Sequence, residues 1–85
     1  MTIRVLYFAW LRERAGRAEE TLALPPTVAT VGGLAAWLHA RDAAGAAAFA
    51  NPTLVRAAVN QKFAPPDAPI ADGDEVAFFP PVTGG

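Results

Sequence analysis

The group with the clearest potential for chemistry in this sequence is the α-carboxylate of its last residue, Gly85. Glycine lacks a Cβ atom, so the Gly84-Gly85 end is thin enough to enter a narrow channel in another protein. A free carboxylate is a poor electrophile. It has to be activated before a nucleophile can attack it, for example as an acyl-adenylate that a partner enzyme makes with ATP. We therefore expect Gly85 to be the reactive residue of the chain.

The residues before the glycines are suited to presenting them at a distance from the folded body. The apolar pair Phe78-Phe79 is followed by Pro80-Pro81, and prolines lack the backbone N–H that a sheet requires. The chain should therefore leave the sheet there and continue, extended, through Val82-Thr83. At roughly 3.3 Å per residue, residues 80–85 could reach about 20 Å into a partner. We predict a folded domain over residues 1–79; the alternative for the tail is a frayed terminus without function.

Three other sets of residues invite a chemical interpretation. Asp72, Asp74 and Glu75 could form an acid–base or cation site, but the Asp-Gly-Asp spacing is typical of a turn. His39 is the only histidine and no cysteine is present, so we expect neither a metal site nor a triad, and a place at the surface for His39. Gly32-Gly33 does not have the spacing of a phosphate-binding loop. We attribute it to close packing of a helix onto a sheet.

Length and composition limit the possible classes of protein. A chain of 85 residues forms one domain with a small core. Its net charge of −1 and scattered basic residues argue against binding to nucleic acid. The longest apolar runs are too short for a membrane span, and the absence of cysteine excludes disulfides and a thiol nucleophile. We expect a cytoplasmic protein that binds its partners through apolar contacts.

The elements that would position the tail follow from hydrophobic periodicity and turn residues. Four strands and two main helical segments are predicted, with a further helical turn ended by Gly16. The strands are Thr2 to Ala9, Arg17 to Leu24, Leu54 to Asn60 (with a short continuation to Ala64) and Glu75 to Phe79. The helices are the stretch that begins at the N-cap Thr30 and the alanine-rich stretch Ala43 to Ala50.

This order of elements indicates an α+β domain in which one main helix packs across a mixed sheet of four to five strands. The first two strands should be antiparallel, and the first and last strands should be parallel central neighbours. Alternation within these strands places Ile3, Val5 and Tyr7 on the helix side. It places Phe8 and Phe79 at the strand ends on the opposite face. Exposed aromatics beside the tail would mark an interaction surface.

The chain resembles the small subunits of molybdopterin synthase, which are sulfur carriers with a ubiquitin-like β-grasp fold. The resemblance spans essentially the whole sequence. It is carried by Val5 to Ala9 with Arg12-Glu13 and Gly16, by Ala57 to Gln61, and most strongly by Asp72 to Gly85. The Gly32-Gly33 pair and Pro65-Pro66 depart from the pattern of the family, away from the tail.

The resemblance implies a function, partners and site residues. Gly85 would be adenylated by an E1-like enzyme that uses ATP and then converted to a thiocarboxylate. The tail, Pro80, Pro81, Val82, Thr83 and Gly84, would enter the large subunit, which transfers the sulfur to a pterin precursor. Phe8, Phe63 and Phe79 would form the partner interface in a heterotetramer. The chain itself would be a co-substrate with no bound cofactor or metal, not an enzyme on its own.

Three other functions are compatible with the same features. Carriers for thiazole (thiamine) synthesis or tRNA thiolation share the fold and the Gly-Gly end, although thiazole carriers are typically shorter. A ubiquitin-like modifier would become attached to lysines of other proteins; Lys62, the only lysine, makes chains built on this protein itself improbable. A β-grasp interaction module with an incidental tail would tolerate deletion of Gly84-Gly85.

Overall fold

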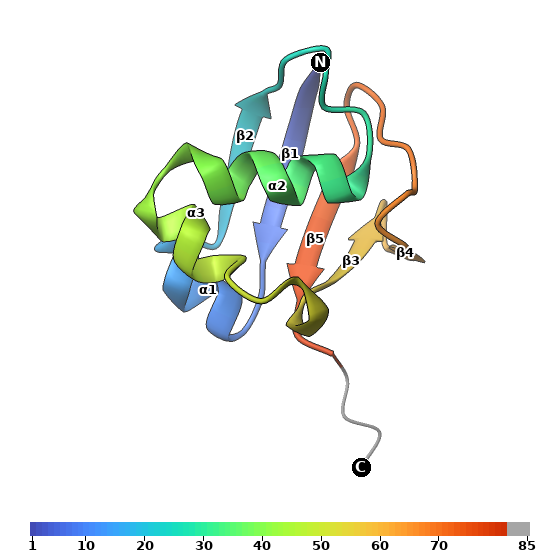
Figure 1. Cartoon of the computed structure of the whole chain (residues 1–85). Coiled ribbons are helices and arrows are strands. Elements are labelled where there is room, and N and C mark those ends of the chain that lie inside the picture. The colour runs from blue at the N-terminus through green and yellow to red at the C-terminus, as the bar shows by residue number, and fades with distance from the viewer. Residues whose placement is uncertain (82–85) are drawn as a thin grey trace.

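Two strands from opposite ends of the chain lie side by side at the centre of the sheet. A computed structural model describes residues 1–81. In it, β1 (Thr2–Tyr7) and β5 (Glu75–Phe79) are parallel, with Val5 opposite Val76 and Tyr7 opposite Phe78. The predicted central pairing is therefore confirmed. It fixes the last strand, and with it the start of the tail, in the middle of the sheet (Figure 1).

The remaining strands complete a five-stranded mixed sheet in the order β2-β1-β5-β3-β4. Strand β2 (Glu19–Ala23) is antiparallel to β1, as predicted, and forms one edge. Strand β3 (Arg56–Val59) is antiparallel to β5, with Arg56 opposite Phe79. A turn with positive φ at Asn60 and Gln61 joins β3 to β4 (Lys62–Ala64), a three-residue strand at the other edge.

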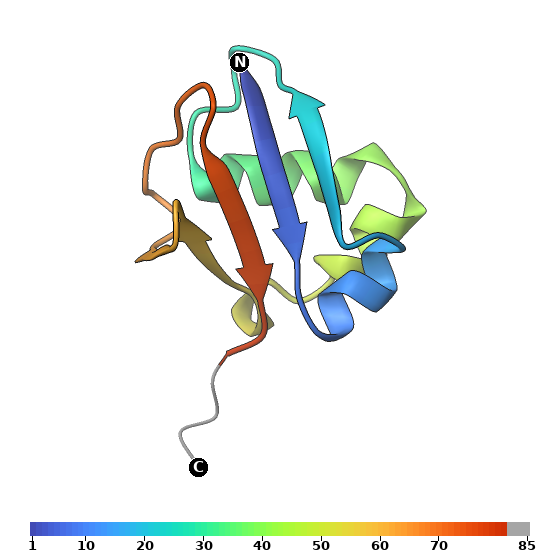
Figure 2. The same cartoon turned by 180° about the vertical axis from the view of Figure 1, so that it is seen from behind.

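Helix α2 (Val31–Arg41) crosses one face of this sheet (Figure 1). The helix begins at Thr30, as predicted, because the Thr30 side chain accepts a hydrogen bond of 3.0 Å from the backbone N–H of Gly33. Its buried residues, Val31, Leu34 and Leu38, recur at helical spacing and pack on the core side chains of β1 and β5. Within the described residues 1–81, no helix covers the opposite face of the sheet (Figure 2).

Shorter helices close the end of the sheet where β1 and β5 finish (Figure 1). Helix α1 (Trp10–Ala15) ends at Gly16, whose left-handed backbone (φ 77°) confirms the predicted cap. Helix α3 (Ala43–Ala48) is capped by Asp42 and places Phe49 against the core. The Phe49 ring packs edge-on against Phe78 with 4.9 Å between centroids, so α3 also supports β5.

Two sequence expectations require correction. The strand expected from Leu54 begins only at Arg56, because Asn51 caps a turn of 3-10 helix, η1 (Pro52–Leu54), through its side chain. Gly32 does lie in close contact, but with the loop after β4 instead of the sheet. Its N–H donates a 2.7 Å hydrogen bond to the Pro66 carbonyl, and a Cβ at this position would lie 3.1 Å from the same oxygen.

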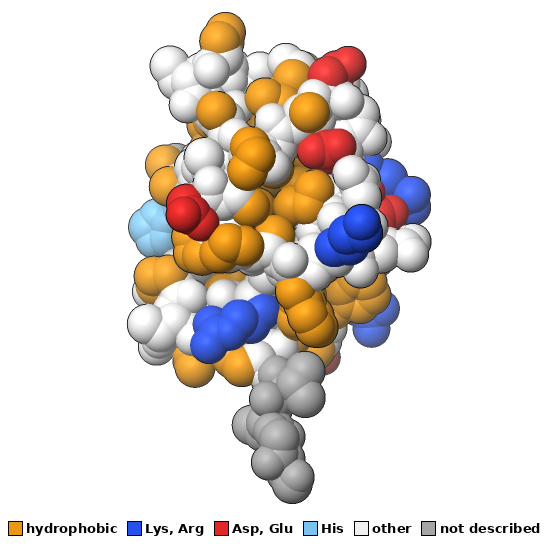
Figure 3. All heavy atoms as spheres, turned by 90° about the vertical axis from the view of Figure 1, so that its right-hand side faces the viewer, with side chains coloured by type: hydrophobic (Ala, Val, Ile, Leu, Met, Phe, Trp, Pro, Cys, Tyr) orange, Lys and Arg blue, Asp and Glu red, His pale blue; other side chains and the backbone are white. Residues whose placement is uncertain are grey.

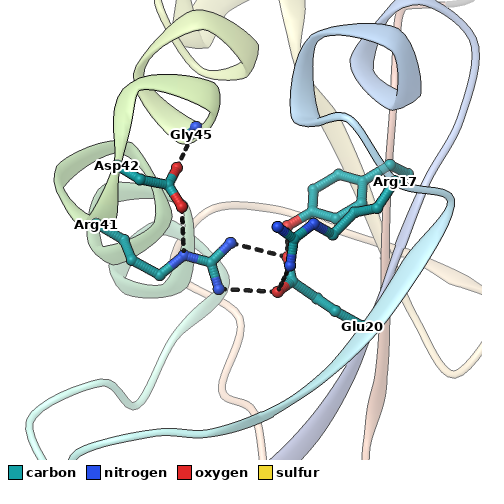
Figure 4. A network of polar contacts seen from close by, with 6 residues as sticks. Arg17, Glu20, Arg41, Asp42 and Gly45 are labelled. Atoms are coloured by element: carbon teal, nitrogen blue, oxygen red, sulfur yellow. Dashed lines mark hydrogen bonds and ion pairs between the residues drawn. The ribbon is translucent and has the colours of Figure 1, made fainter.

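A partly buried carboxylate joins the edge of the sheet to α2. Glu20 of β2 accepts two hydrogen bonds from Arg41, at 2.8 and 2.9 Å, one of 2.9 Å from Arg17, and one of 2.6 Å from the Tyr7 hydroxyl (Figure 4). Asp42, which caps α3, also lies 3.3 Å from the Arg41 Nε. The network thus connects β1, β2, α2 and α3 at the side of the molecule away from β3 and β4.

Candidate functional site

The base of the tail is held rigidly by the strands on both sides of β5. The backbone N–H of Phe8 donates a 3.1 Å hydrogen bond to the carbonyl of Phe78, and Arg56 lies opposite Phe79 in the β3–β5 register. Pro80 and Pro81, both half-buried, then leave the sheet. The predicted reactive end, with Val82, Thr83, Gly84 and Gly85, lies outside the described residues.

The uncovered face of the sheet carries an apolar surface beside the start of the tail. We call this surface the open-face patch. Strand parity and register assign to it Leu6, Phe8, Ala58, Phe63, Ala77 and Phe79. Phe63 is 83% exposed and Phe8 48% exposed, whereas the two alanines are buried. The rings of Phe63 and Phe79 lie 5.7 Å apart between centroids. Large exposed aromatics grouped in this way are typical of protein interaction surfaces.

The structure therefore places together all three aromatics that were predicted for the partner interface. Phe8 comes directly after β1, one position beyond the Tyr7–Phe78 pair. It therefore lies beside Phe79, the residue that follows Phe78. The sequence reasoning missed Ala58 and Ala77, which face each other across β3 and β5 and make the middle of the patch flat. In the sequence, only their small size sets them apart. That size indicates a flat surface only when the strand register shows that the two alanines are neighbours.

The charged residues nearest the patch lie at its edge and pair with one another, so its centre stays apolar. Arg4 pairs with Glu19 at 2.6 Å and lies 3.6 Å from Glu75, so these charges balance one another at the edge away from the tail. The hydrogen bond and charge of Glu19 raise the pKa of Arg4 above its already high value, which keeps the guanidinium charged. The centre of the patch is left to aromatic and aliphatic side chains.

The acidic cluster is a turn, as predicted. Asp74 accepts hydrogen bonds from the Ala71 N–H at 2.8 Å and from the Asn60 side chain at 2.9 Å. Asp72 accepts one of 2.6 Å from the N–H of Thr2. These contacts fasten the start of β5 to β1 and β3, at the opposite end of the sheet from the tail. Within residues 1–81 no group of three or more possible metal ligands is found.

His39 is exposed on α2, as predicted, and lies on the rim of an apolar groove between α2 and β3 that the sequence did not predict. Among the described helices, none is long and apolar enough to cross a membrane.

Comparison with known proteins finds a matching family model, similar sequences and similar solved structures. The ThiS family model matches residues 5–85. The molybdopterin synthase sulfur carrier subunit of Escherichia coli is 48% identical over 98% of this chain and 99% of its own length.

Among solved structures, a putative molybdopterin converting factor subunit 1 from Pyrococcus furiosus (TM-score 0.78, 32% identity) covers 96% of this chain and 99% of its own. SAMP1, a small archaeal modifier protein from Haloferax volcanii (TM-score 0.74, 28% identity), covers all of both chains. These neighbours and the five-stranded mixed sheet confirm the ubiquitin-like β-grasp fold.

Proposed function

This chain belongs to the ThiS family and is a relative of molybdopterin synthase sulfur carrier subunits, and from that premise we propose that it carries sulfur on Gly85 for molybdopterin synthesis. The observation that carries the proposal is the position of the tail. It starts from the central strand β5, at the edge of the open-face patch. A partner that binds the patch receives the tail in a fixed direction.

The proposed chemistry begins with activation of the Gly85 carboxylate. A carboxylate oxygen attacks the α-phosphorus of ATP on an E1-like enzyme, an acyl-adenylate forms, and pyrophosphate leaves. A sulfur donor at the oxidation level of sulfide then attacks the carbonyl carbon. The C–S bond forms, the C–O bond to AMP breaks, and a thiocarboxylate remains at the end of the tail.

Sulfur transfer then takes place in the large subunit of the synthase. The thiocarboxylate sulfur attacks an oxygen-bearing carbon of the pterin precursor. The C–S bond forms, the C–O bond at that carbon breaks, and the oxygen takes a proton from the large subunit and leaves as water. A thioester then links the carrier to the pterin. Water cleaves the C–S bond to Gly85, so the sulfur stays on the pterin and the carrier regains its carboxylate. This chain contributes the sulfur atom, the reach of the tail and the docking surface, and the acid–base groups belong to the large subunit.

The decisive measurement is the intact mass of the protein after co-expression with its activating enzyme and a sulfur source. We expect a gain equal to the replacement of one oxygen by sulfur, located at Gly85 by fragmentation. A variant that lacks Gly85 is the control and should not gain mass. An unmodified wild-type mass beside an enzyme that demonstrably forms adenylates would contradict the proposal. Added pterin precursor and large subunit would then distinguish this pathway from thiazole synthesis or tRNA thiolation.

The similarity to SAMP1 favours a second function, attachment of Gly85 to lysines of other proteins. Both functions need the same activated carboxylate, and they differ in whether a sulfide-level donor or an amine attacks it. Peptides from digested cell extracts that carry a C-terminal Gly85 remnant on lysine would establish the modifier function. Their absence, together with the mass gain above, would assign the chain to sulfur transfer alone.

A further inference from the structure

A second apolar surface lies around the corner from the open-face patch. It is a groove of about 910 Å³ between α2 and the strands β3 and β4, and we call it the helix–sheet groove. Its walls include Ala35 and Ala36 from α2, Val55 and Ala57 at β3, and Pro65 and Pro66 from the loop after β4. Figure 3 shows apolar side chains gathered over this side of the molecule. Strand β4, which contributes Ala64 to the wall, is only three residues long.

The open-face patch alone is too small for a stable protein interface. A standard interface uses about 20–30 residues from each partner. Only Phe8 and Phe63 of the patch are large and well exposed, while Ala58 and Ala77 are 8% and 9% exposed. A partner that binds here must therefore extend beyond the patch, and the helix–sheet groove is the adjacent apolar surface.

The patch and the groove are connected around the ends of β3 and β4. A smaller hollow that reaches Phe63 and Phe79 shares Arg56, Ala57, Ala64 and Pro65 with the wall of the groove. Arg56 stands at this junction and is exposed. Its guanidinium is held by hydrogen bonds to the carbonyls of Thr53, at 3.0 Å, and Val55, at 3.3 Å.

Arg56 also indicates the charge of the partner. Arg4, Arg17 and Arg41 pair with carboxylates, whereas within residues 1–81 no carboxylate lies within ion-pair distance of Arg12, Arg14 or Arg56. Of these three arginines, Arg56 lines both the groove and the smaller hollow. The nearest surface around it is apolar. A carboxylate placed here by a partner would bind a guanidinium that is already oriented. The pair would lie at the rim of an apolar contact, where the attraction between opposite charges is stronger than in water.

We propose that the protein which receives the tail also places an apolar segment with an acidic side chain in the helix–sheet groove, and that the acidic group pairs with Arg56. This inference rests on the proposed function, because it takes the large subunit of the synthase as the partner. It assigns two further parts of the chain, the outer side of α2 and Arg56, to partner recognition. The tail would then be only one of three contacts.

The test measures the affinity of full-length variants for the purified large subunit from the same organism, by calorimetry. Ala36→Glu places a charge in the groove, and Ala40→Glu places the same charge on α2 outside it; both alanines are exposed. Arg56→Glu reverses the charge at the junction, and Lys62→Glu does so at an exposed position that lines neither hollow. We expect Ala36→Glu and Arg56→Glu to weaken binding at least tenfold and the two controls to change it less than twofold. Circular dichroism melts confirm that each variant is folded.

The outcomes separate this inference from the proposed function. If Phe63→Ala weakens binding while Ala36→Glu and Arg56→Glu bind like the wild type, the groove is not part of the interface and the proposed function stands. If the wild type does not bind the large subunit at all, the proposed function fails and the inference with it. If the protein alone forms a dimer that Ala36→Glu disrupts, the groove belongs to a contact between copies and the inference is overturned.

Discussion

Phe63 is the residue whose exposure is hardest to explain without a partner. Its side chain is 83% exposed and contacts Phe79 at the edge of the sheet. We predict that Phe63→Ala weakens binding to the large subunit about tenfold or more, because truncation of an aromatic anchor costs over ~1 kcal/mol. The free energy of unfolding should change by no more than about 0.5 kcal/mol, as for other surface substitutions. Titration calorimetry and urea unfolding measure the two quantities. A large loss of stability would instead make Phe63 a structural residue.

In the proposed function, Gly84 and Gly85 act through their small size and through the free carboxylate of Gly85. We predict that one residue added after Gly85, or the substitution Gly84→Val, abolishes sulfur transfer, because the carboxylate is displaced or a side chain blocks the channel. The melting temperature should stay unchanged, since both positions follow the last residue of β5. Thiocarboxylate formation and product yield are followed by mass spectrometry. Normal transfer by an extended variant with an intact terminus would show that the tail does not enter a narrow site.

Among the elements, α3 shows how a single glycine fixes the packing of two helices. Gly45 is the only non-alanine residue of Ala43–Ala48, and a Cβ at this position would lie 1.8 Å from the carbonyl oxygen of Leu38. We predict that Gly45→Ala destabilises the protein by about 3 kcal/mol, at the upper end of the usual cost of overpacking. Ala47→Gly, an exposed change in the same helix, should cost at most ~1 kcal/mol. Chemical denaturation of both variants measures the two losses. A Gly45→Ala variant as stable as the wild type, or more stable, would mean that helix propensity and not packing sets the effect.

The contact between Gly32 and Pro66 predicts a milder effect at the start of α2. An alanine at position 32 gains helix propensity of up to ~1 kcal/mol. Its Cβ would press on the Pro66 carbonyl, which is held by a 2.7 Å hydrogen bond and by the adjacent prolines. We therefore expect Gly32→Ala to be destabilising by about 1 kcal/mol, since overpacking costs as little as that where the neighbours shift only slightly. The same denaturation experiment would contradict this explanation if the variant were more stable than the wild type.

Patterns among residues close in the sequence predicted the strands and helices well. The features that were not predicted depend on contacts between residues far apart in the sequence. Alternation in Ile3, Val5 and Tyr7 and the Thr30 cap depend only on neighbours in the sequence, so the strand, its buried face and the helix start were predictable. The contact of Gly32 joins residues more than thirty positions apart, so its partner was not. The helix–sheet groove depends on where β4 ends and on the packing of α2, and neither leaves a pattern in the sequence.

At the scale of the whole molecule, the Glu20 network makes stability depend on pH in the acid range. Burial disfavours the charged form of Glu20, but hydrogen bonds from Arg41 and Tyr7 and the charges of Arg41 and Arg17 outweigh it and lower the pKa below its usual 4.5. A lowered pKa in the folded state means that the stabilisation is present above about pH 4.5 and is lost as the pH falls through the folded-state pKa.

We predict that Glu20→Gln lowers the free energy of unfolding at pH 7 by about 1.5–3 kcal/mol, the range for hydrogen bonds to charged groups. The difference from the wild type should shrink as the pH falls below 4.5, because the wild type then loses the same charge. Urea unfolding at several pH values measures this difference. A constant difference down to pH 2.5 would show that the charge of Glu20 is not what stabilises the network.

The same network also makes the stability of the protein depend on pH in the alkaline range. Burial, followed by the hydrogen bond to Glu20 and its charge, raises the pKa of the Tyr7 hydroxyl well above its usual 10.0. A raised pKa in the folded state gives stabilisation that is complete below pH 10 and is lost above it as the folded-state pKa is approached. We predict that Tyr7→Phe removes this alkaline loss of stability. Melting temperatures between pH 8 and pH 11 test it, and an unchanged slope in the variant would exclude Tyr7 as its source.

The central position of β5 also has a consequence for how the protein is made. Strand β5 lies between β1 and β3 and supplies Val76 and Phe78 to the middle of the core, yet it is the last element to be translated. While the ribosome still holds the last few tens of residues, β1 has no neighbour on that side and the core is incomplete. The nascent chain therefore cannot complete its core until residues 75–79 have left the ribosome. Chains that stop before β5 lack the strand needed to complete the core, so they are left to cellular proteases.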